Sequence, residues 1–310
     1  MIPTSWWKKF RHWKPVALFV KFSERIYLPG FERMPLYDVA KFFVKALRQD
    51  ALNEKAAAIA FNLFLAVFPT IVLFFTVISY IPVENFEATL FQQLESIMPE
   101  QTYNITITTI EDIVQQQRGG LLSISFLMVL FFSTQGVVAM MTSFNNTIYI
   151  TETRPWFKQR ILALVIVGIE SLLALVITAL MIVSHVVQTY FESLLFIPNK
   201  LIYYFFSGGH WVIIIALYFF GFSFLYYFGP AVKSRFRLIS PGATLATILS
   251  VLFSFGFNIY IDHFSQFNIL YGSLGTLILT LLWIFFHALM LLIGFELNIS
   301  IRAVRRTKTP

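Results

Sequence analysis

The stretch that decides the fold is residues 271–301, YGSLGTLILTLLWIFFHALMLLIGFELNISI, close to the C-terminal end of the sequence. From Ser273 to Phe295 it contains no Lys, Arg, Asp or Glu. A helix of that length, at about 1.5 Å per residue, crosses a hydrocarbon core of roughly 30 Å. The run ends in Glu296 and Asn298, and an unpaired carboxylate is costly in hydrocarbon. We therefore predict that this helix turns one face toward protein.

The composition places the whole chain in the same class. Of its 310 residues, 57% are hydrophobic and only 13% are charged, whereas ordinary soluble domains are about 25% charged. The sequence therefore predicts an all-α, polytopic membrane protein without a separate soluble domain of normal size. There are no cysteines, which excludes disulfides and thiolate metal sites.

Apolar runs separated by polar loops predict six transmembrane helices. Residues 1–55 form a basic N-terminal region, and its apolar residues after Leu36 recur at the spacing of an amphipathic helix on the cytoplasmic surface. Residues 82–120 are acidic and predict a helical hairpin on the outer face, and residues 302–310 form a basic cytoplasmic tail. We place the spans at about 56–81, 121–148, 161–187, 211–228, 241–261 and 273–300.

The basic residues predict the orientation of these spans. Lys and Arg cluster in residues 1–55, 151–160, 230–240 and 301–310, whereas the other loops contain only Arg118 and Lys200. Because cytoplasmic loops carry the excess of Lys and Arg, both termini are predicted to be cytoplasmic. This distribution accounts for the net charge of +7, and no nucleic-acid partner is predicted.

Polar residues inside the spans are the candidate functional residues. Glu170 lies about ten residues into the third span, near the membrane midplane, where a carboxyl group is costly. Gln135, Thr142 and Asn146 share one helical face of the second span. This face indicates either packing between helices or a path for a polar substrate. Pro69 predicts a kink or local unwinding of the first span, and thus a hinge.

Two further features concern the last two spans. Small residues recur every fourth position in the fifth span, which predicts a seam that another helix approaches closely; these residues are Gly242, Ala246, Ser250 and Ser254. Ser240 and Pro241 predict the start of that helix. At the end of the sixth span, Glu296 is predicted to be ionised and paired with Arg302 or a basic loop, with Asn298 or Asn146 as hydrogen-bond partners.

Several segments carry a resemblance to a known family. They are residues 56–69 (AAAIAFNLFLAVFP), the pattern of Asn146, Tyr149, Glu152, Arg154 and Pro155, residues 240–247 (SPGATLAT), and residues 271–275 (YGSLG) with 294–298 (GFELN). In this order they resemble the BrkB/YihY family of bacterial inner-membrane proteins, many of which were labelled ribonuclease BN. The resemblance implies six spans and a bacterial inner membrane. Asn62 and Phe295 depart from the family pattern, and Phe295 is expected to shift or tighten the last helix.

The sequence leaves two classes of function open. A ribonuclease needs clustered carboxylates or histidines to hold metal ions or to act as acid and base. Here the histidines are scattered, and no cofactor or metal site is predicted; we reject this function. The polar residues inside the spans favour transport of a lipid-like anion over transport of a small solute or ion. The alternative is a membrane scaffold or accessory protein. Membrane lipids are the predicted partners, and an oligomer or a protein partner remains open.

Overall fold

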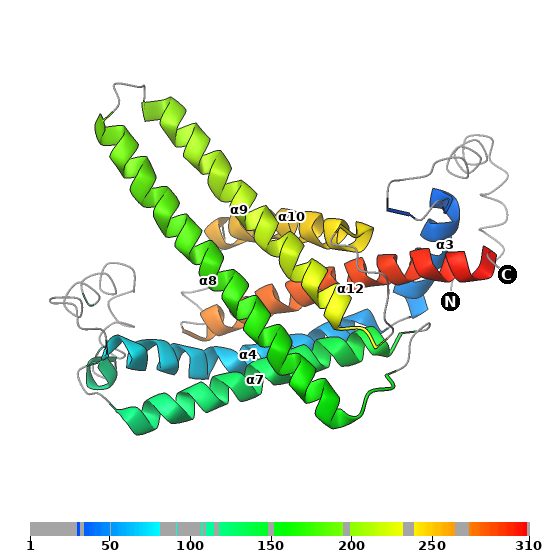
Figure 1. The fold of residues 1–310 in the computed structure, drawn as a ribbon, viewed down its shortest axis with the longest axis horizontal. Helices are drawn as coiled ribbons and strands as arrows, with labels where there is room; N and C mark the ends of the chain where they lie inside the picture. The colour runs from blue at the N-terminus through cyan, green and yellow to red at the C-terminus, as the bar shows by residue number, and fades with distance from the viewer. Residues whose placement is uncertain are drawn as a thin grey trace.

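The structure is a computed structural model, and it describes residues 30–31, 34–49, 51–80, 91, 107, 110–114, 118–147, 152–194, 199–231, 239–263 and 273–308. The described elements are helices, which confirms the predicted all-α fold. They are α3 (Leu36–Gln49), α4 (Leu52–Ile78), α7 (Gly119–Asn145), α8 (Trp156–Leu194), α9 (Asn199–Phe228), α10 (Pro241–His263) and α12 (Ser273–Lys308) (Figure 1). All except α3 are long and apolar enough to cross a membrane, as predicted.

Several helices extend beyond the predicted boundaries of the spans. α8 continues to Leu194, beyond its predicted end at 187, and α9 already begins at Asn199, before its predicted start at 211. α12 continues to Lys308, and the predicted tail is therefore largely helical. The predicted spans ended where apolar residues give way to polar ones, but a helix can continue through polar residues beyond the membrane. At about 1.5 Å per residue, α8 and α12 are longer than a hydrocarbon core of roughly 30 Å.

Pro69 does not interrupt α4. The helix is continuous from Leu52 to Ile78 with Pro69 inside it, so the predicted local unwinding is wrong. Pro69 itself offers no backbone N–H to the helix. On the next residue, the Thr70 hydroxyl donates a hydrogen bond to the Ala66 carbonyl at 2.7 Å. This bond does not replace the missing one, because Pro69 leaves the carbonyl of Leu65, and not that of Ala66, without its helix donor. Packing against neighbouring helices allows proline inside membrane helices.

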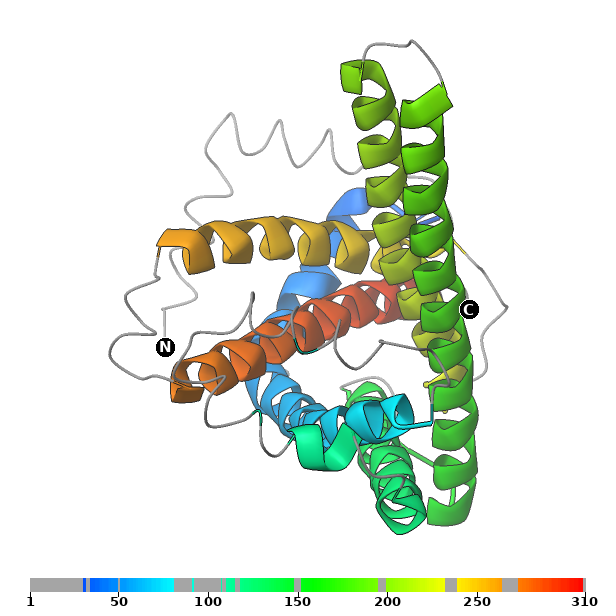
Figure 2. The same ribbon diagram turned by 90° about the vertical axis from the view of Figure 1, so that its left-hand side faces the viewer.

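α12 occupies the centre of the helix arrangement. Its main contacts are with α3, α4 and α10, with a smaller contact to α7, and other contacts join α4 to α7, α7 to α8, α8 to α9 and α9 to α10. The six long helices therefore form a closed circuit in which α8 lies opposite α12. Figures 1 and 2 show the α8–α9 pair crossing the other helices obliquely.

The buried core lies at one end of this circuit, which we call the packed end. It is formed by the first turns of α4, α8 and α10, the last turns of α7 and α9, and the middle turns of α12. Its buried members are Leu52, Ala56, Ile59, Val137, Met141, Phe144, Ala163, Ile166, Phe222, Leu225, Tyr226, Ala243, Ala246, Ala288, Leu291, Leu292, Phe295 and Ile299. Because neighbouring helices alternate in direction, these segments all meet on the same side.

The opposite ends of several helices are separated, and we call this side the splayed end. No residue is buried over 276–287 of α12, 251–261 of α10 or 167–181 of α8. Each stretch exceeds two helical turns, so every face of these helices is at least partly exposed. In Figure 1, the α8–α9 pair leaves α4 and α7 toward this end.

The amphipathic helix α3 packs against protein. Its apolar residue Val39 is buried with Ile301 and Val304 of α12, while Lys41 and Lys45 are exposed. The prediction placed the apolar face of this helix on the membrane surface. In the structure, buried residues of that face cover the C-terminal extension of α12, which carries its own apolar residues beyond the span. The position of α3 at the membrane surface stays a prediction.

Most of the predicted outer hairpin lies outside the described residues. Within it, Ile110 and Val114 are buried and pack with Phe75 of α4 and Phe91. This small cluster lies on the splayed end of α4. Arg118, at the start of α7, pairs with Asp112 at 2.7 Å.

Candidate functional site

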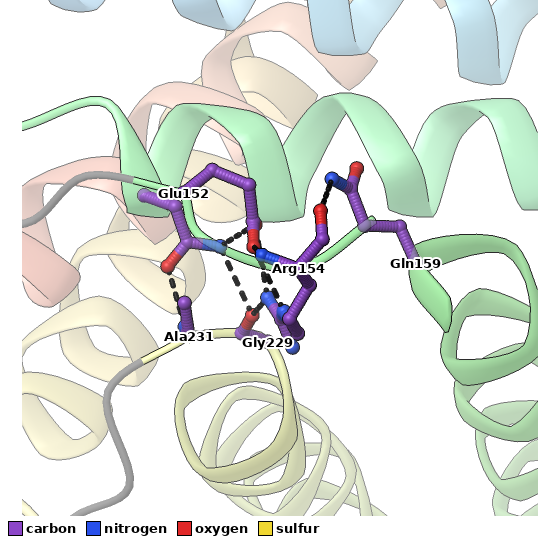
Figure 3. Close-up of polar contacts among 6 residues, drawn as sticks. Glu152, Arg154, Gln159, Gly229 and Ala231 are labelled. Atoms are coloured by element: carbon purple, nitrogen blue, oxygen red, sulfur yellow. Dashed lines mark hydrogen bonds and ion pairs between the residues drawn. The ribbon is translucent and has the colours of Figure 1, made fainter. Parts of the chain in front are cut away.

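A polar junction joins three segments at the packed end (Figure 3). Glu152 and Arg154 lie between α7 and α8, and Arg154 Nε donates to Glu152 Oε1 at 3.0 Å while Nη2 donates to Oε2 at 3.1 Å. The Arg154 backbone N–H also donates to Oε1, at 2.9 Å. This is a forked ion pair closed by a backbone bond, which fixes both side chains and the turn between them.

The junction also holds the end of α9. Arg154 Nη2 donates to the Gly229 carbonyl at 2.5 Å, and the Ala231 backbone N–H donates to Asn145 Oδ1 at 2.6 Å. Asn145, the last residue of α7, is fully buried and donates through Nδ2 to Glu152. The loop after α7 and the loop after α9 are therefore bonded to one another through Asn145 and Arg154.

The ion pair sets the protonation of Glu152. Burial alone would raise its pKa, but the hydrogen bonds and charge of Arg154, together with the bond from Asn145, outweigh this effect. The pKa of the Glu152 carboxyl is thus lowered below its ordinary value. It is ionised at neutral pH, as a paired carboxylate should be.

Beneath the junction, aromatic rings connect α7, α9 and α12. Phe144 stacks on Phe295 with ring centroids 4.2 Å apart, and both rings contact Tyr226. The Tyr226 hydroxyl donates to the Leu291 carbonyl at 2.6 Å. Phe295, which departs from the family pattern, therefore fills the space between α12 and α7.

The small residues of α10 face α12. A Cβ added to Gly242 would lie 2.1 Å from the Gly294 carbonyl, and a Cβ added to Gly294 would lie 2.7 Å from the Ala246 Cβ. Ser250 is fully buried in the same row, and Ser254 continues it. The backbones of the two helices thus approach as closely as glycine permits.

Asn298 completes the start of α10. The Gly242 backbone N–H donates to Asn298 Oδ1 at 2.8 Å, and Asn298 Nδ2 donates to Ser240 Oγ at 3.1 Å. Ser240 Oγ also accepts from the Ala243 N–H at 3.1 Å, which is the N-cap bond expected of this residue. Glu296 is only 2% exposed at the same end. Of its predicted hydrogen-bond partners, Asn298 is bonded to α10, and the predicted pairing of Glu296 with Arg302 or a basic loop stays a prediction.

Halfway along the spans, a second polar group joins α9, α10 and α12. His287 Nδ1 lies 2.9 Å from the Trp283 carbonyl, which can only accept, so Nδ1 carries the proton. His287 Nε2 therefore accepts from the Tyr218 hydroxyl at 2.9 Å and the Ser254 hydroxyl at 3.3 Å. Sequence reasoning did not identify this group. The available signal was a single histidine in the charge-free run of the last span.

Glu170 lies on the other side of α9. Its Oε2 is 3.2 Å from the position of a Cβ added to Gly221, so the missing side chain of Gly221 makes room for the carboxyl. Its Oε1 is buried and has no hydrogen-bond partner among the described residues.

These groups share one level of the molecule, and we call Glu170, Tyr218, Ser254 and His287 the midspan belt. Each lies within one helical turn of the middle of its apolar span. Each also lies within about one turn of the buried residue that borders the stretch without buried residues in its helix; those residues are Ile166, Phe222, Ser250 and Ala288. The belt therefore marks the level at which close packing ends.

The structure places the predicted polar residues of the second span at different depths from their polar neighbours. Thr142 and Asn146 are exposed and Gln135 is half-buried, whereas Thr134, Ser143 and Asn145 are buried. The Thr134 and Ser143 hydroxyls donate to carbonyls of their own helix, at 2.8 Å each. A membrane helix with apolar residues all around gives little sequence signal for which face is buried. In the described part of the chain, no group of three or more His, Asp or Glu could hold a metal ion.

The fold and the polar groups define an integral membrane protein with six candidate spans. Residues 43–310 match the model of the family described as Virulence factor BrkB, and the chain belongs to that family. The expected resemblance is thereby confirmed.

Relatives within bacteria have low sequence identity but match most of the chain. The Bacillus subtilis (strain 168) protein named ribonuclease-like protein YfkH is 23% identical over 83% of this chain and 92% of its own length. A UPF0761 membrane protein of Coxiella burnetii is 21% identical over 82% of this chain and 89% of its own. A UPF0761 membrane protein of Chromohalobacter salexigens is 23% identical over 82% of this chain and 61% of its own. No solved structure matches the chain.

Proposed function

We propose that this protein is a non-enzymatic transporter of the bacterial inner membrane, which moves a lipid-like anion between the two membrane faces. The midspan belt is the observation that supports this proposal. Polar and ionisable groups inside a membrane are costly and mark substrate or ion paths in transporters. Here they lie at the level where the packed end gives way to the splayed end.

The splayed end suits the acyl chains of such a substrate, and the midspan belt suits its polar head. The splayed end offers apolar helix faces that are open to acyl chains, among them Leu252 of α10 and Ile278 of α12. The belt offers hydroxyl, imidazole and carboxyl groups to a polar head. For the substrate to move past the belt toward the packed end, the contacts of that end must loosen. The packed end would then act as one of the two gates of an alternating-access transporter.

The orientation belongs to the same proposal. Lys55, Arg154, Lys158 and Arg160 lie at the packed end or in its loops, as does the basic end of α12. Because cytoplasmic loops carry the excess of basic residues, the packed end and both termini face the cytoplasm. The splayed end then faces the periplasm.

Reconstitution into vesicles tests the transport step. The purified protein is placed in vesicles with a fluorescent phosphatidylglycerol, and a membrane-impermeant reductant reports how fast label becomes accessible. We expect translocation above the rate of protein-free vesicles. Glu170→Gln keeps the shape of the side chain but removes its titration, and the rate should fall about tenfold or more, which corresponds to about 1.4 kcal/mol or more in the barrier.

Glu54→Gln is the matched control, because Glu54 is an exposed carboxylate in the first turn of α4. It should leave the rate unchanged. A Glu170→Gln variant that melts like the parent and transports like it would assign Glu170 a structural role. A parent protein that moves no lipid would favour the alternative, a scaffold or accessory protein in which the polar groups only join helices.

A further inference from the structure

Arg160, in the second turn of α8, is held between two aromatic rings. Its guanidinium carbon lies 5.4 Å from the centre of the Phe131 ring and 5.8 Å from that of the Trp156 ring. Its Nη1 donates to Thr134 Oγ1 at 3.3 Å. The Thr134 hydroxyl proton is already given to the Phe131 carbonyl, so its oxygen is free to accept from Arg160. These contacts fix the direction of the guanidinium.

Arg160 has no carboxylate partner among the described residues. Other arginines do: Arg118 pairs with Asp112 and Arg154 with Glu152. A guanidinium has five N–H donors, and the Thr134 bond uses one of them. Arg160 lies one turn inside the α8 span, and its contacts Phe131 and Thr134 lie near the middle of α7, so the guanidinium is inside the apolar layer. A charge there is costly unless an anion or water compensates it, and local thinning of the bilayer brings lipid phosphates toward such a charge.

The surface beside Arg160 matches a lipid headgroup. Trp156, at which the apolar span Trp156–Met181 begins, is 69% exposed, and Phe157 is 65% exposed. Lys158 is exposed on the same turn. Aromatic residues beside cations are typical of the headgroup layer, and a guanidinium fork matches the geometry of a phosphate.

We propose that Arg160, with Phe131, Thr134 and Trp156, forms a binding site for the phosphate of an anionic phospholipid. The remaining N–H groups of Arg160 bind the phosphate oxygens, and Trp156 and Phe157 lie along the glycerol and upper acyl region. Lys158 adds a second, more distant positive charge. The inference does not depend on transport, because a bound lipid need not cross the membrane.

Lipid titration of the full-length protein in detergent tests the site. Binding is followed by native mass spectrometry, with phosphatidylglycerol, phosphatidylcholine and glycerol phosphate as separate ligands. The parent should bind phosphatidylglycerol about tenfold more tightly than phosphatidylcholine, because both lipids carry the phosphate but the choline cation of phosphatidylcholine is repelled by Arg160 and Lys158. Arg160→Gln should abolish this preference. Lys158→Gln, the matched control, should lower it only about twofold, because an exposed charge is screened.

Three results would overturn the proposal. The first is an Arg160→Gln variant that keeps the preference for phosphatidylglycerol. The second is glycerol phosphate that competes as well as the lipid, which would show a site for free phosphate esters. The third applies if Arg160→Gln does not fold, in which case Arg160→Lys is measured. This variant should bind phosphatidylglycerol about threefold or more weakly, because an ammonium group lacks the forked donors of a guanidinium. Unchanged binding would contradict the site. Binding without translocation would support this inference while contradicting transport.

Discussion

At the scale of single residues, the charge of Glu152 stabilises the packed end through its ion pair with Arg154. Its lowered pKa means that the folded state favours the ionised form. The stability it contributes is therefore fully present above the pKa of an unfolded Glu, about 4.3, and is lost as the pH falls through the lower folded value. Asn145 and Gly229 depend on the same pair for their orientation.

Glu152→Gln should weaken the packed end. The change leaves the Arg154 guanidinium without its anion, and hydrogen bonds to charged groups contribute about 1.5–3 kcal/mol each. Thermal unfolding in detergent at neutral pH should show a lower melting temperature than the parent. The difference should shrink as the pH is lowered below about 4.3, where the parent loses the same interaction. Asp112→Asn is the control, because its pair with Arg118 is about half exposed and exposed pairs contribute roughly 0–1 kcal/mol.

At the scale of elements, the contact between α10 and α12 follows from residue size. Gly242, Gly294 and Ala246 leave no volume between the helices. Ala246→Leu should therefore destabilise the protein by about 1–3 kcal/mol or more, because added methylene groups in a close-packed contact force the helices apart. Ala174→Leu makes the same change on an exposed face of α8 and should be neutral. Equal melting temperatures for the two variants would contradict the described packing.

The same contact shows what the sequence could and could not predict. Spacing of four residues is a local property of α10, so the seam was visible without a structure. The spacing does not indicate which helix packs against the seam. The partner is α12, which contacts it through Gly294, 52 residues after Gly242 in the sequence. For a related reason, the sequence did not show which polar residues of α7 are buried: Thr134, Thr142, Ser143 and Asn145 point in several directions around the helix, and only packing distinguishes them. The polar group of His287, Tyr218 and Ser254 could be predicted only with knowledge of how α9, α10 and α12 pack.

At the scale of the whole molecule, the separation into a packed and a splayed end is the main property that composition did not indicate. Hydropathy predicted the six spans because the cost of burying polar groups in lipid acts on each helix alone. The depth at which helices separate depends on all of them together. Small and aromatic residues such as Gly242 and Phe144 fill the packed end, whereas exposed aliphatic residues such as Leu175 and Leu252 dominate the other.

Cysteine labelling tests the proposed orientation of these two ends, and the chain suits it because it contains no cysteine. Gly120→Cys places a thiol at the splayed end of α7, where an added Cβ meets nothing within 4 Å. Thr307→Cys places one on the exposed surface near the end of α12, on the packed side. An impermeant maleimide added to intact spheroplasts should label Gly120→Cys and leave Thr307→Cys unreacted until the membrane is permeabilised, because basic residues hold the packed end in the cytoplasm. The reverse labelling pattern would show that the protein has the opposite orientation in the membrane, with the Arg160 site in the other leaflet.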